Sequence, residues 1–421
     1  MNTQLGRIRQ AVRQFGWHRL THNNCTLGGC RRTTQSPEPL EPRIVYSGTV
    51  PVLKFTEEDG DSITIKLTGL GSFTATQVDP DANDKGSLSL VALTGTDFKS
   101  KLTLTFQAGT GSDGQFHIGS ITANSPLGAI TGASVALDGA GLSVAGNLGA
   151  VTLGTVSAPI TISGSLGNLT VNGDAAGNWQ ATTFKKIQIT GGDLSADIRS
   201  TAPLGSDLAI GSIKVTGGNL LGDVIALGKL GAISAKSGRD GGGVISAGVI
   251  EGAALADLSA SGGITDVLRI SGAVGKIAAG RGISGIFRAG SFGAISAGDD
   301  FSATITATDT LVALGKKPAI GMVTIIGDMT GELHADGALA GLTVKGSRAN
   351  AGAISGVTIE VGSLGKLTAA SSIDGTVTIT GALGSVKAGG ALSGEWEVGL
   401  CGRDCNQRRD VGRVSFARRI R

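Results

Sequence analysis

The chain has 421 residues, among them 70 glycines and 9 prolines, and a formal net charge of +3. The shortage of proline and the lack of a Gly-X-Y period exclude collagen, and the regular alternation of apolar residues argues against disorder. The two ends hold seven arginines each and no lysine, which leaves 22 of the 36 basic and 29 of the 33 acidic side chains in the middle. This mildly acidic middle argues against nucleic-acid binding by the body of the protein.

The first segment, residues 1–43, is polar and arginine-rich and ends in Ser36-Pro37-Glu38-Pro39 and the residues after it. We expect a disordered leader, because such a composition supplies no apolar core. It contains no apolar run of 7–15 residues, so no standard secretory signal is visible. Since no run of 18 apolar residues occurs anywhere, we also expect no membrane-spanning helix.

Residues 44–117 alternate apolar and polar side chains, with predicted strands at 62–67, 87–90 and 101–106. The alternation is typical of half-buried β-strands. The segment is interpreted either as a capping region for the repeats that follow or as a small β domain. A solenoid needs a cap because its open end presents unpaired backbone groups.

An acidic loop inside this segment is a candidate calcium site. Asp79, Asp81, Asn83 and Asp84 place oxygen ligands at close spacing, as calcium loops do. Asp84 stands where an EF-hand has glycine, so the match to that motif is incomplete. An ordinary polar hairpin turn is the alternative. Residues 57–61 form a second acidic turn.

From residue 118 to residue 400 a short phrase recurs: an apolar residue, glycine, any residue, then a second apolar residue. Eight of the thirteen steps between its copies span 18–21 residues. Such a fixed short period is the mark of a solenoid. The clearest copies begin at Ile118, Leu127, Leu148, Leu166, Ile210, Phe292, Leu364 and Leu383.

The residues after each phrase alternate as they do in a strand, for example Leu169-Thr170-Val171. A second strand per repeat is visible in residues 356–361, and glycine pairs such as Gly191-Gly192 suit the corners between strands. Helices are disfavoured, because each interior glycine costs a helix about 1 kcal/mol. The sequence therefore predicts an all-β parallel β-helix with coils of about 18–20 residues. We expect a right-handed coil, the default for parallel crossovers, and a small β-rich N-terminal cap.

The phrase stops at residue 400, and residues 401–421 form an arginine-rich tail. This break predicts that the tail is the non-native or truncated end of a longer array. All four cysteines (Cys25, Cys30, Cys401 and Cys405) lie near the two ends of the chain. Two local disulfides and four free thiols both remain open, whereas a shared zinc site is disfavoured by the spacing.

Leu40-Glu41-Pro42-Arg43 resembles the LEPR-xLL motif near the start of large, repeat-rich bacterial surface or secreted proteins. Val45-Tyr46 stand where that family has two leucines. Residues 55–105 and the glycine phrases are similar to the β-strand-repeat proteins that carry this motif, and the likeness covers most of residues 55–400. The resemblance implies export to the cell surface and a structural or adhesive role, and brings no catalytic residues with it.

The sequence thus predicts a non-enzymatic structural or adhesive repeat protein of the bacterial surface or exterior, with surface polysaccharide or other surface proteins as partners. The alternative is a polysaccharide lyase or glycoside hydrolase, because both use β-helices. Such sites need paired carboxylates on adjacent coils, often with a basic residue. Asp299-Asp300 and Arg239-Asp240 are the local candidates, but each pair directly follows a glycine, as turn residues do. We therefore expect no catalytic and no cofactor-binding residues.

Overall fold

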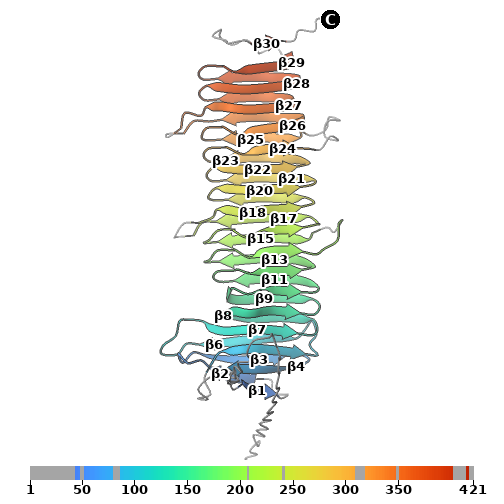
Figure 1. Cartoon of the computed structure of the whole chain (residues 1–421), viewed down its shortest axis with the longest axis vertical. Coiled ribbons are helices and arrows are strands. Elements are labelled where there is room, and N and C mark those ends of the chain that lie inside the picture. Colours follow the sequence, from blue (N-terminus) through green and yellow to red (C-terminus); the bar gives the residue numbers. More distant parts are fainter. Residues whose placement is uncertain are drawn as a thin grey trace, which may run out of the picture. The chain divides into compact units, whose positions relative to one another are not determined.

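The computed structural model is built of β-strands, and no helix occurs among the residues that it describes. These residues are 43–47, 52–78, 86–205, 208–238, 242–308, 318–347, 350–401 and 414–416. All of them belong to one compact unit, Glu41–Arg421. Figure 1 shows its strands stacked one above another in chain order.

The first six strands form a cap that pairs mainly in antiparallel fashion. β1 pairs with β4 and β4 with β5, while β2 pairs with β3 and β3 with β6. Two short antiparallel sheets result, and each continues into the solenoid through its last strand. The cap strands are β1 (Arg43–Ser47), β2 (Val52–Thr56), β3 (Ser62–Thr68), β4 (Ser72–Val78), β5 (Leu88–Thr94) and β6 (Lys101–Gln107).

From β5 and β6 onward every pairing is parallel, and each coil of the chain contributes one strand to each of two stacks. Face A starts at β6 and carries every copy of the glycine phrase except the one at Ile118. Face B starts at β5 and carries that copy on β7. Several long strands bend through a corner and serve both faces.

Strands of face A alone or of face A and the following corner are β9 (Leu148–Val156), β11 (Ser165–Val171), β13 (Thr183–Thr190), β15 (Ile210–Thr216), β17 (Leu230–Lys236), β19 (Leu255–Ala260), β21 (Ala273–Ala279), β23 (Ser291–Ala297) and β25 (Ile320–Ile325). Strands of face B are β7 (Phe116–Ala123), β10 (Ile160–Ile162), β12 (Asn178–Ala181), β14 (Asp197–Ser200), β16 (Val224–Ala226), β18 (Ile245–Gly252), β20 (Ile264–Ile270), β22 (Ile283–Ala289), β24 (Thr304–Ala307) and β30 (Val414–Phe416). Strands that serve both faces are β8 (Leu127–Val144), β26 (Glu332–Val344), β27 (Ile354–Ala369), β28 (Ile373–Ala388) and β29 (Glu395–Cys401).

A third side closes each coil between face A and face B. It consists of single residues that form isolated parallel bridges with the coils before and after them. Ala175, Leu194 and Leu220 are three successive bridge residues, and all three are fully buried. Each coil is therefore a circuit with three sides and three corners, whereas a coil of two strands would have two corners.

The core is a continuous apolar column inside these circuits. In face A the first, fourth and sixth residues from the phrase point inward, as Leu166, Leu169 and Val171 do, while Thr170 between them faces outward. Burying a side chain of this size contributes about 1.5–3 kcal/mol. Because the same positions stack in register from coil to coil, the alternation read from the sequence builds the column directly.

The glycine of the phrase is explained by a close approach between coils. A Cβ atom at Gly231 would lie 1.7 Å from the carbonyl oxygen of Gly211 in the preceding coil, and one at Gly293 would lie 1.8 Å from that of Gly275. The backbones therefore approach each other closely at this column of face A.

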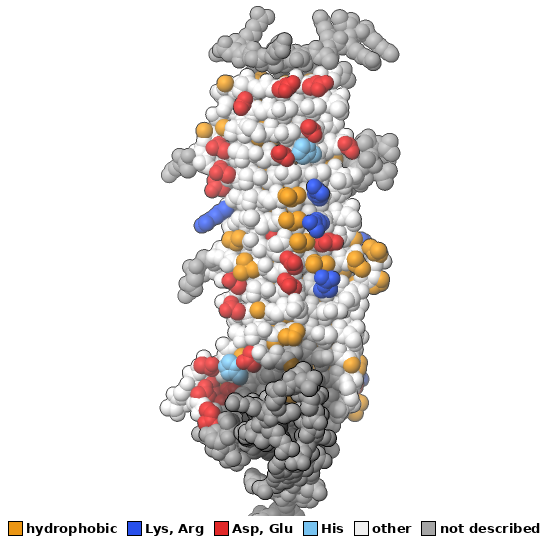
Figure 2. Space-filling view, viewed as in Figure 1, with side chains coloured by type: hydrophobic (Ala, Val, Ile, Leu, Met, Phe, Trp, Pro, Cys, Tyr) orange, Lys and Arg blue, Asp and Glu red, His pale blue; other side chains and the backbone are white. Residues whose placement is uncertain are grey.

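The predicted all-β solenoid is confirmed, with a parallel ladder that runs from β7 to β29. The antiparallel strands lie where the cap was expected. The leader falls outside the described residues apart from Arg43, and of the tail only residue 401 and β30 are described. Figure 2 shows that the few basic side chains of the visible face lie over the middle coils, whereas acidic ones are spread from the cap to the last coils.

Candidate functional site

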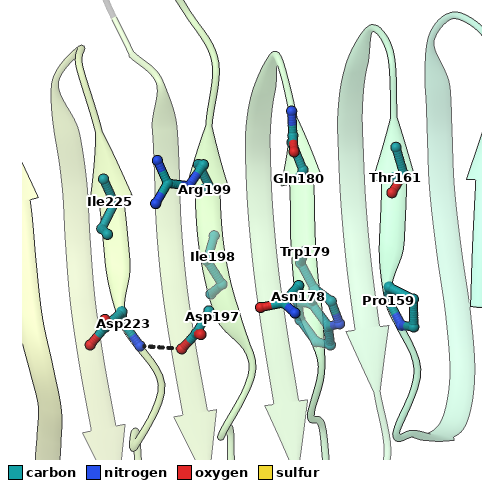
Figure 3. A pocket seen from close by; sticks show the side chains of 10 residues that line it. All are labelled: Pro159, Thr161, Asn178, Trp179, Gln180, Asp197, Ile198, Arg199, Asp223 and Ile225. Atoms are coloured by element: carbon teal, nitrogen blue, oxygen red, sulfur yellow. Dashed lines mark hydrogen bonds between the residues drawn. The ribbon is translucent and has the colours of Figure 1, made fainter.

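A hollow of about 280 Å³ on face B brings together carboxylates from neighbouring coils. Asp197 on β14 and Asp223 before β16 are adjacent in the stacking register, and Arg199 lies two residues after Asp197 (Figure 3). The fully buried Trp179 lines the hollow from its inner side. The polar side chains of the lining lie at its outer edge. Its indole nitrogen donates to the carbonyl oxygen of Ala176 at 3.1 Å.

Both carboxylates of this hollow also bind backbone amides. Oδ1 of Asp197 accepts the amide of Asp223 at 3.0 Å, and Oδ1 of Asp223 accepts the amide of Val249 at 3.0 Å. The second oxygen of each carboxylate has no hydrogen bond to any residue that the structure describes. Two carboxylates and one guanidinium on adjacent coils are the kind of set that a carbohydrate-cleaving β-helix requires.

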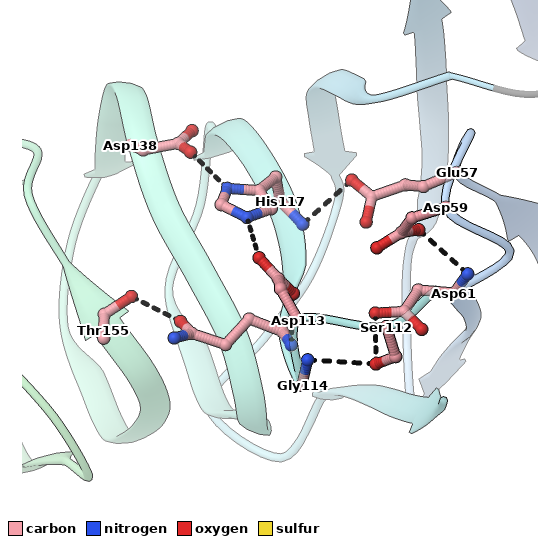
Figure 4. A network of polar contacts seen from close by, with 10 residues as sticks. Glu57, Asp59, Asp61, Ser112, Asp113, Gly114, His117, Asp138 and Thr155 are labelled. Carbon is pink, nitrogen blue, oxygen red and sulfur yellow. Dashed lines mark hydrogen bonds and ion pairs between the residues drawn. The ribbon is translucent and has the colours of Figure 1, made fainter. Parts of the chain in front are cut away.

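A second polar cluster lies where the cap meets the first coil (Figure 4). It joins Glu57, Asp59 and Asp61, from the turn between β2 and β3, to His117 on β7. Asp61 is fully buried; Oδ1 accepts the amide of Gly109 at 2.6 Å and Oδ2 accepts the hydroxyl of Ser112 at 2.8 Å. These two bonds fasten the β2–β3 turn to the segment that follows β6.

His117 is held by carboxylates on both ring nitrogens. Nδ1 lies 2.6 Å from Oδ2 of Asp138, and Nε2 lies 3.3 Å from Oδ2 of Asp113. The hydrogen bond to Asp138 is the main reason why the pKa of His117 is raised above its usual 6.5. The two carboxylates therefore stabilise the imidazolium form relative to the neutral ring.

Glu57 is the buried acid of this cluster. Burial raises its pKa from 4.5 to about 7, against the opposing effect of the His117 amide, which donates to Oε1 at 3.1 Å. Near neutral pH a large share of the Glu57 side chain is therefore protonated.

Among the described residues, Glu57, Asp59 and Asp61 could hold a metal ion, because one oxygen from each lies within 4.8 Å of the others. Calcium takes six to eight oxygen ligands. Asp61 already accepts a hydrogen bond at each oxygen, and one oxygen of Asp59 accepts the amide of Asp61 at 3.0 Å. The three residues supply only part of a calcium shell, so calcium stays a prediction from the sequence.

The predicted calcium loop, Asp79, Asp81, Asn83 and Asp84, lies outside the described residues, as does the pair Arg239-Asp240. Asp299 and Asp300 are described and lie exposed at a corner between coils. The amide nitrogen of the Asn350 side chain donates to both, at 3.1 and 2.7 Å, and Oδ1 of Asp300 also accepts the amide of Asp328 at 2.8 Å. These bonds tie successive corners together, which is a structural role.

Sequence reasoning missed the pair in the face B hollow, although its signal was present. Asp197 and Asp223 are 26 residues apart, the same step that separates the phrases at Phe184 and Ile210. Adding the local repeat length to the number of each charged residue gives its neighbour in the next coil. This procedure would have placed the two carboxylates side by side. The link from Glu57 to His117 could not be found in this way, because it joins the irregular cap to the first coil.

Comparisons of the chain with family models, with curated proteins and with solved structures give no match. In the described part of the chain, no helix has the length and hydropathy that crossing a bilayer requires.

Proposed function

We propose that this chain is a non-enzymatic structural or adhesive repeat protein that is exported to the bacterial surface or beyond it. The observation that supports the proposal is the parallel ladder, which holds coil upon coil around one apolar column. At about 4.8 Å per coil, the 13 phrase copies of face A give a solenoid of roughly 60 Å. A stack of this kind separates whatever is attached to its two ends and presents the same outward positions repeatedly.

A one-coil excision tests the structural role. Ile320 pairs with Leu339, and Phe301 and Met329 occupy successive bridges, so removal of residues 320–338 joins the chain in register. We expect the shortened protein to fold with an unchanged far-ultraviolet circular dichroism spectrum per residue. Loss of the β-sheet signal would contradict a repetitive, modular stack. Labelling of intact cells of the source bacterium with antibodies against the solenoid tests export, and labelling only after lysis would contradict it.

A second candidate function, cleavage of a polysaccharide, is favoured by the Asp197–Asp223 pair with Arg199 beside it. In this case Asp197 and Asp223 would act as general acid and base, and Arg199 would hold an anionic substrate group. Incubation with a panel of neutral and acidic polysaccharides separates the two functions. Release of reducing or unsaturated ends that is lost in both Asp197→Asn and Asp223→Asn would overturn the non-enzymatic proposal.

A further inference from the structure

One outward row of face B contains two arginines in immediate succession. Arg269 on β20 pairs in register with Arg288 on β22, and both side chains are exposed. Neighbouring strands of a sheet lie about 4.8 Å apart, so the two cations are stacked one coil apart. Like charges directly opposite each other destabilise a sheet. An anion between them would turn this repulsion into attraction.

Neither guanidinium makes a hydrogen bond or an ion pair with any residue that the structure describes. Glu251 is the nearest acid in the row, and it pairs with Arg269 on the side away from Arg288. On the other side Arg288 is followed by Thr306, which carries no charge. The two arginines thus outnumber the acid beside them and keep their donors free.

The same two arginines line a hollow of about 400 Å³ at the edge of face B. Leu204 and Leu227 form its apolar rim and are 77% and 54% exposed. Large apolar side chains this exposed cost free energy in water, and a ligand with an apolar face would cover them.

Glu251, the acid next to Arg269 in the row, also lines the hollow, as do two hydroxyl groups. Ser271 donates its proton to the carbonyl oxygen of Ala253 at 3.3 Å, and Thr308 donates to that of Ala289 at 3.1 Å. Because both hydroxyl protons are donated to the preceding coil, the lone pairs of the two hydroxyl oxygens remain available as acceptors in the hollow. They suit a ligand that brings hydroxyl donors of its own.

We infer that this hollow binds an acidic polysaccharide. A sugar carboxylate lies between Arg269 and Arg288, where planar guanidinium groups bind its two oxygens. The apolar face of the sugar ring covers Leu204 and Leu227, and ring hydroxyls donate to Ser271 and Thr308. An acidic peptide fits less well, because extended peptides bind open strand edges, and β20 is already paired with both β18 and β22.

The inference rests on the adhesive part of the proposed function and names its ligand class. The test uses the full chain and two matched probes, the β-1,4-linked tetramer of glucuronate and that of glucose, which differ only at the sixth carbon of each ring. We expect calorimetric titration to show binding of the glucuronate tetramer at least tenfold tighter than that of the glucose tetramer. Its affinity should fall as salt is added.

The double variant Arg269→Gln/Arg288→Gln should weaken binding of the glucuronate tetramer at least tenfold. The matched control is Arg281→Gln, since Arg281 is exposed in the turn between β21 and β22 and lies outside this hollow. The control should bind as the parent chain does. Arg269→Lys/Arg288→Lys should retain part of the affinity, because the charge stays while the planar fork is lost. Since these side chains are exposed, circular dichroism should show all variants folded.

Equal binding of both tetramers, or binding unaffected by the double variant, would overturn the inference. So would binding of a glutamate oligopeptide in preference to the glucuronate tetramer. Any of these results leaves the structural role intact, which the coil excision tests separately. Cleavage of the tetramer during the titration would instead count against the non-enzymatic function, so the two failures can be told apart.

Discussion

The cap and the solenoid stabilise themselves in different ways. Of the nine buried polar or charged residues among those described, six lie in the cap segment between residues 57 and 100. In the described part of the coils beyond residue 121, Ser200 and Asp266 are the only buried residues of this kind, and the rest of the core is apolar. The cap depends on specific polar contacts such as those of Asp61, whereas the solenoid depends on repetition of the same apolar stack.

The difference follows from what each region must do. A parallel stack satisfies its backbone groups by adding another coil, and its end has no such partner. The cap turns the chain from antiparallel to parallel pairing, which leaves amides such as those of Gly109 and His117 outside the ladder. Carboxylates of Asp61 and Glu57 accept these amides. Buried carboxylates are therefore found where regular pairing stops.

The largest expected effect concerns the apolar column. Phe287 is fully buried and stacks in register between Leu268 and Ile305. Phe287→Ala should lower the free energy of unfolding by about 3–5 kcal/mol, as for other large-to-small core changes. Urea titration measures the loss. Because each coil contacts mainly its neighbours, amide exchange should rise in the coils around β22 and stay unchanged at Phe73 in the cap; a uniform rise would contradict the modular account.

A substitution at the close backbone approach in face A should lower the free energy of unfolding by a smaller amount. Gly231→Val places a branched side chain where even a Cβ would lie 1.7 Å from the Gly211 carbonyl oxygen. Ala256 occupies this position one coil later and Lys185 two coils earlier, so the column accepts an unbranched Cβ, and valine adds a second branch there. We expect a loss of about 1–3 kcal/mol in urea titration. The control is Gly263→Ala, whose nearest neighbour is 3.3 Å away; equal losses would remove the steric explanation.

Asp266 is an exception within the solenoid, since it is a buried acid next to a register shift in β18. Oδ1 accepts the amide of Ala247 at 2.6 Å, and Oδ2 has no partner among the described residues. Burial raises the pKa of Asp266 from 3.8 to about 6, so the folded state holds this proton more tightly than the unfolded chain. Its stabilising effect is present below pH 3.8 and is lost as pH rises through about 6.

Asp266→Asn should therefore stabilise the chain at pH 8 by up to about 2 kcal/mol, because the amide carries no charge to bury. It should also flatten the dependence of stability on pH between 4 and 6. Urea midpoints measured across this range test both statements. A variant that is less stable than the parent at pH 8 would show that the ionised carboxylate stabilises the folded chain.

The smallest effect concerns the cap. The pKa of Glu57 is raised to about 7 by burial, so its contribution to stability is present below pH 4.5 and lost as pH rises through 7. Because the pKa of His117 is also raised, its contribution is present below pH 6.5 and disappears at higher pH. Both groups weaken the cap as the solution becomes basic.

Glu57→Gln keeps an acceptor for the His117 amide and removes the charge. After allowance for solvent screening, we expect a gain of about 1 kcal/mol at pH 8 and none at pH 4. Amide exchange of β2 and β3 measures the change locally, and Glu397→Gln in the last coil serves as the exposed control. A gain of the same size at both pH values would argue against titration of Glu57.

The fold could be predicted from the sequence because one apolar pattern is repeated at a nearly fixed step. In each copy the same positions are apolar, and these positions face the core. Residues 62–67 and 101–106 of the cap were also recognisable as strands, yet β1, β2 and β4 were not predicted. Their pairing depends on contacts between distant segments rather than on a repeat. The third side of each coil escaped prediction for a similar reason, since a single bridge residue such as Ala175 leaves no alternation to read.

The most direct measurement of the central claim is the distance between two labelled coils. Asn168 and Lys366 are exposed in one outward row of face A and lie nine coils apart in the stacking register. With the native cysteines replaced by serine, spin labels at 168 and 366 should give a narrow distance distribution near 43 Å. Excision of residues 320–338 should shorten this distance by about 4.8 Å. A broad distribution, or a distance that the excision leaves unchanged, would contradict a solenoid of stacked coils.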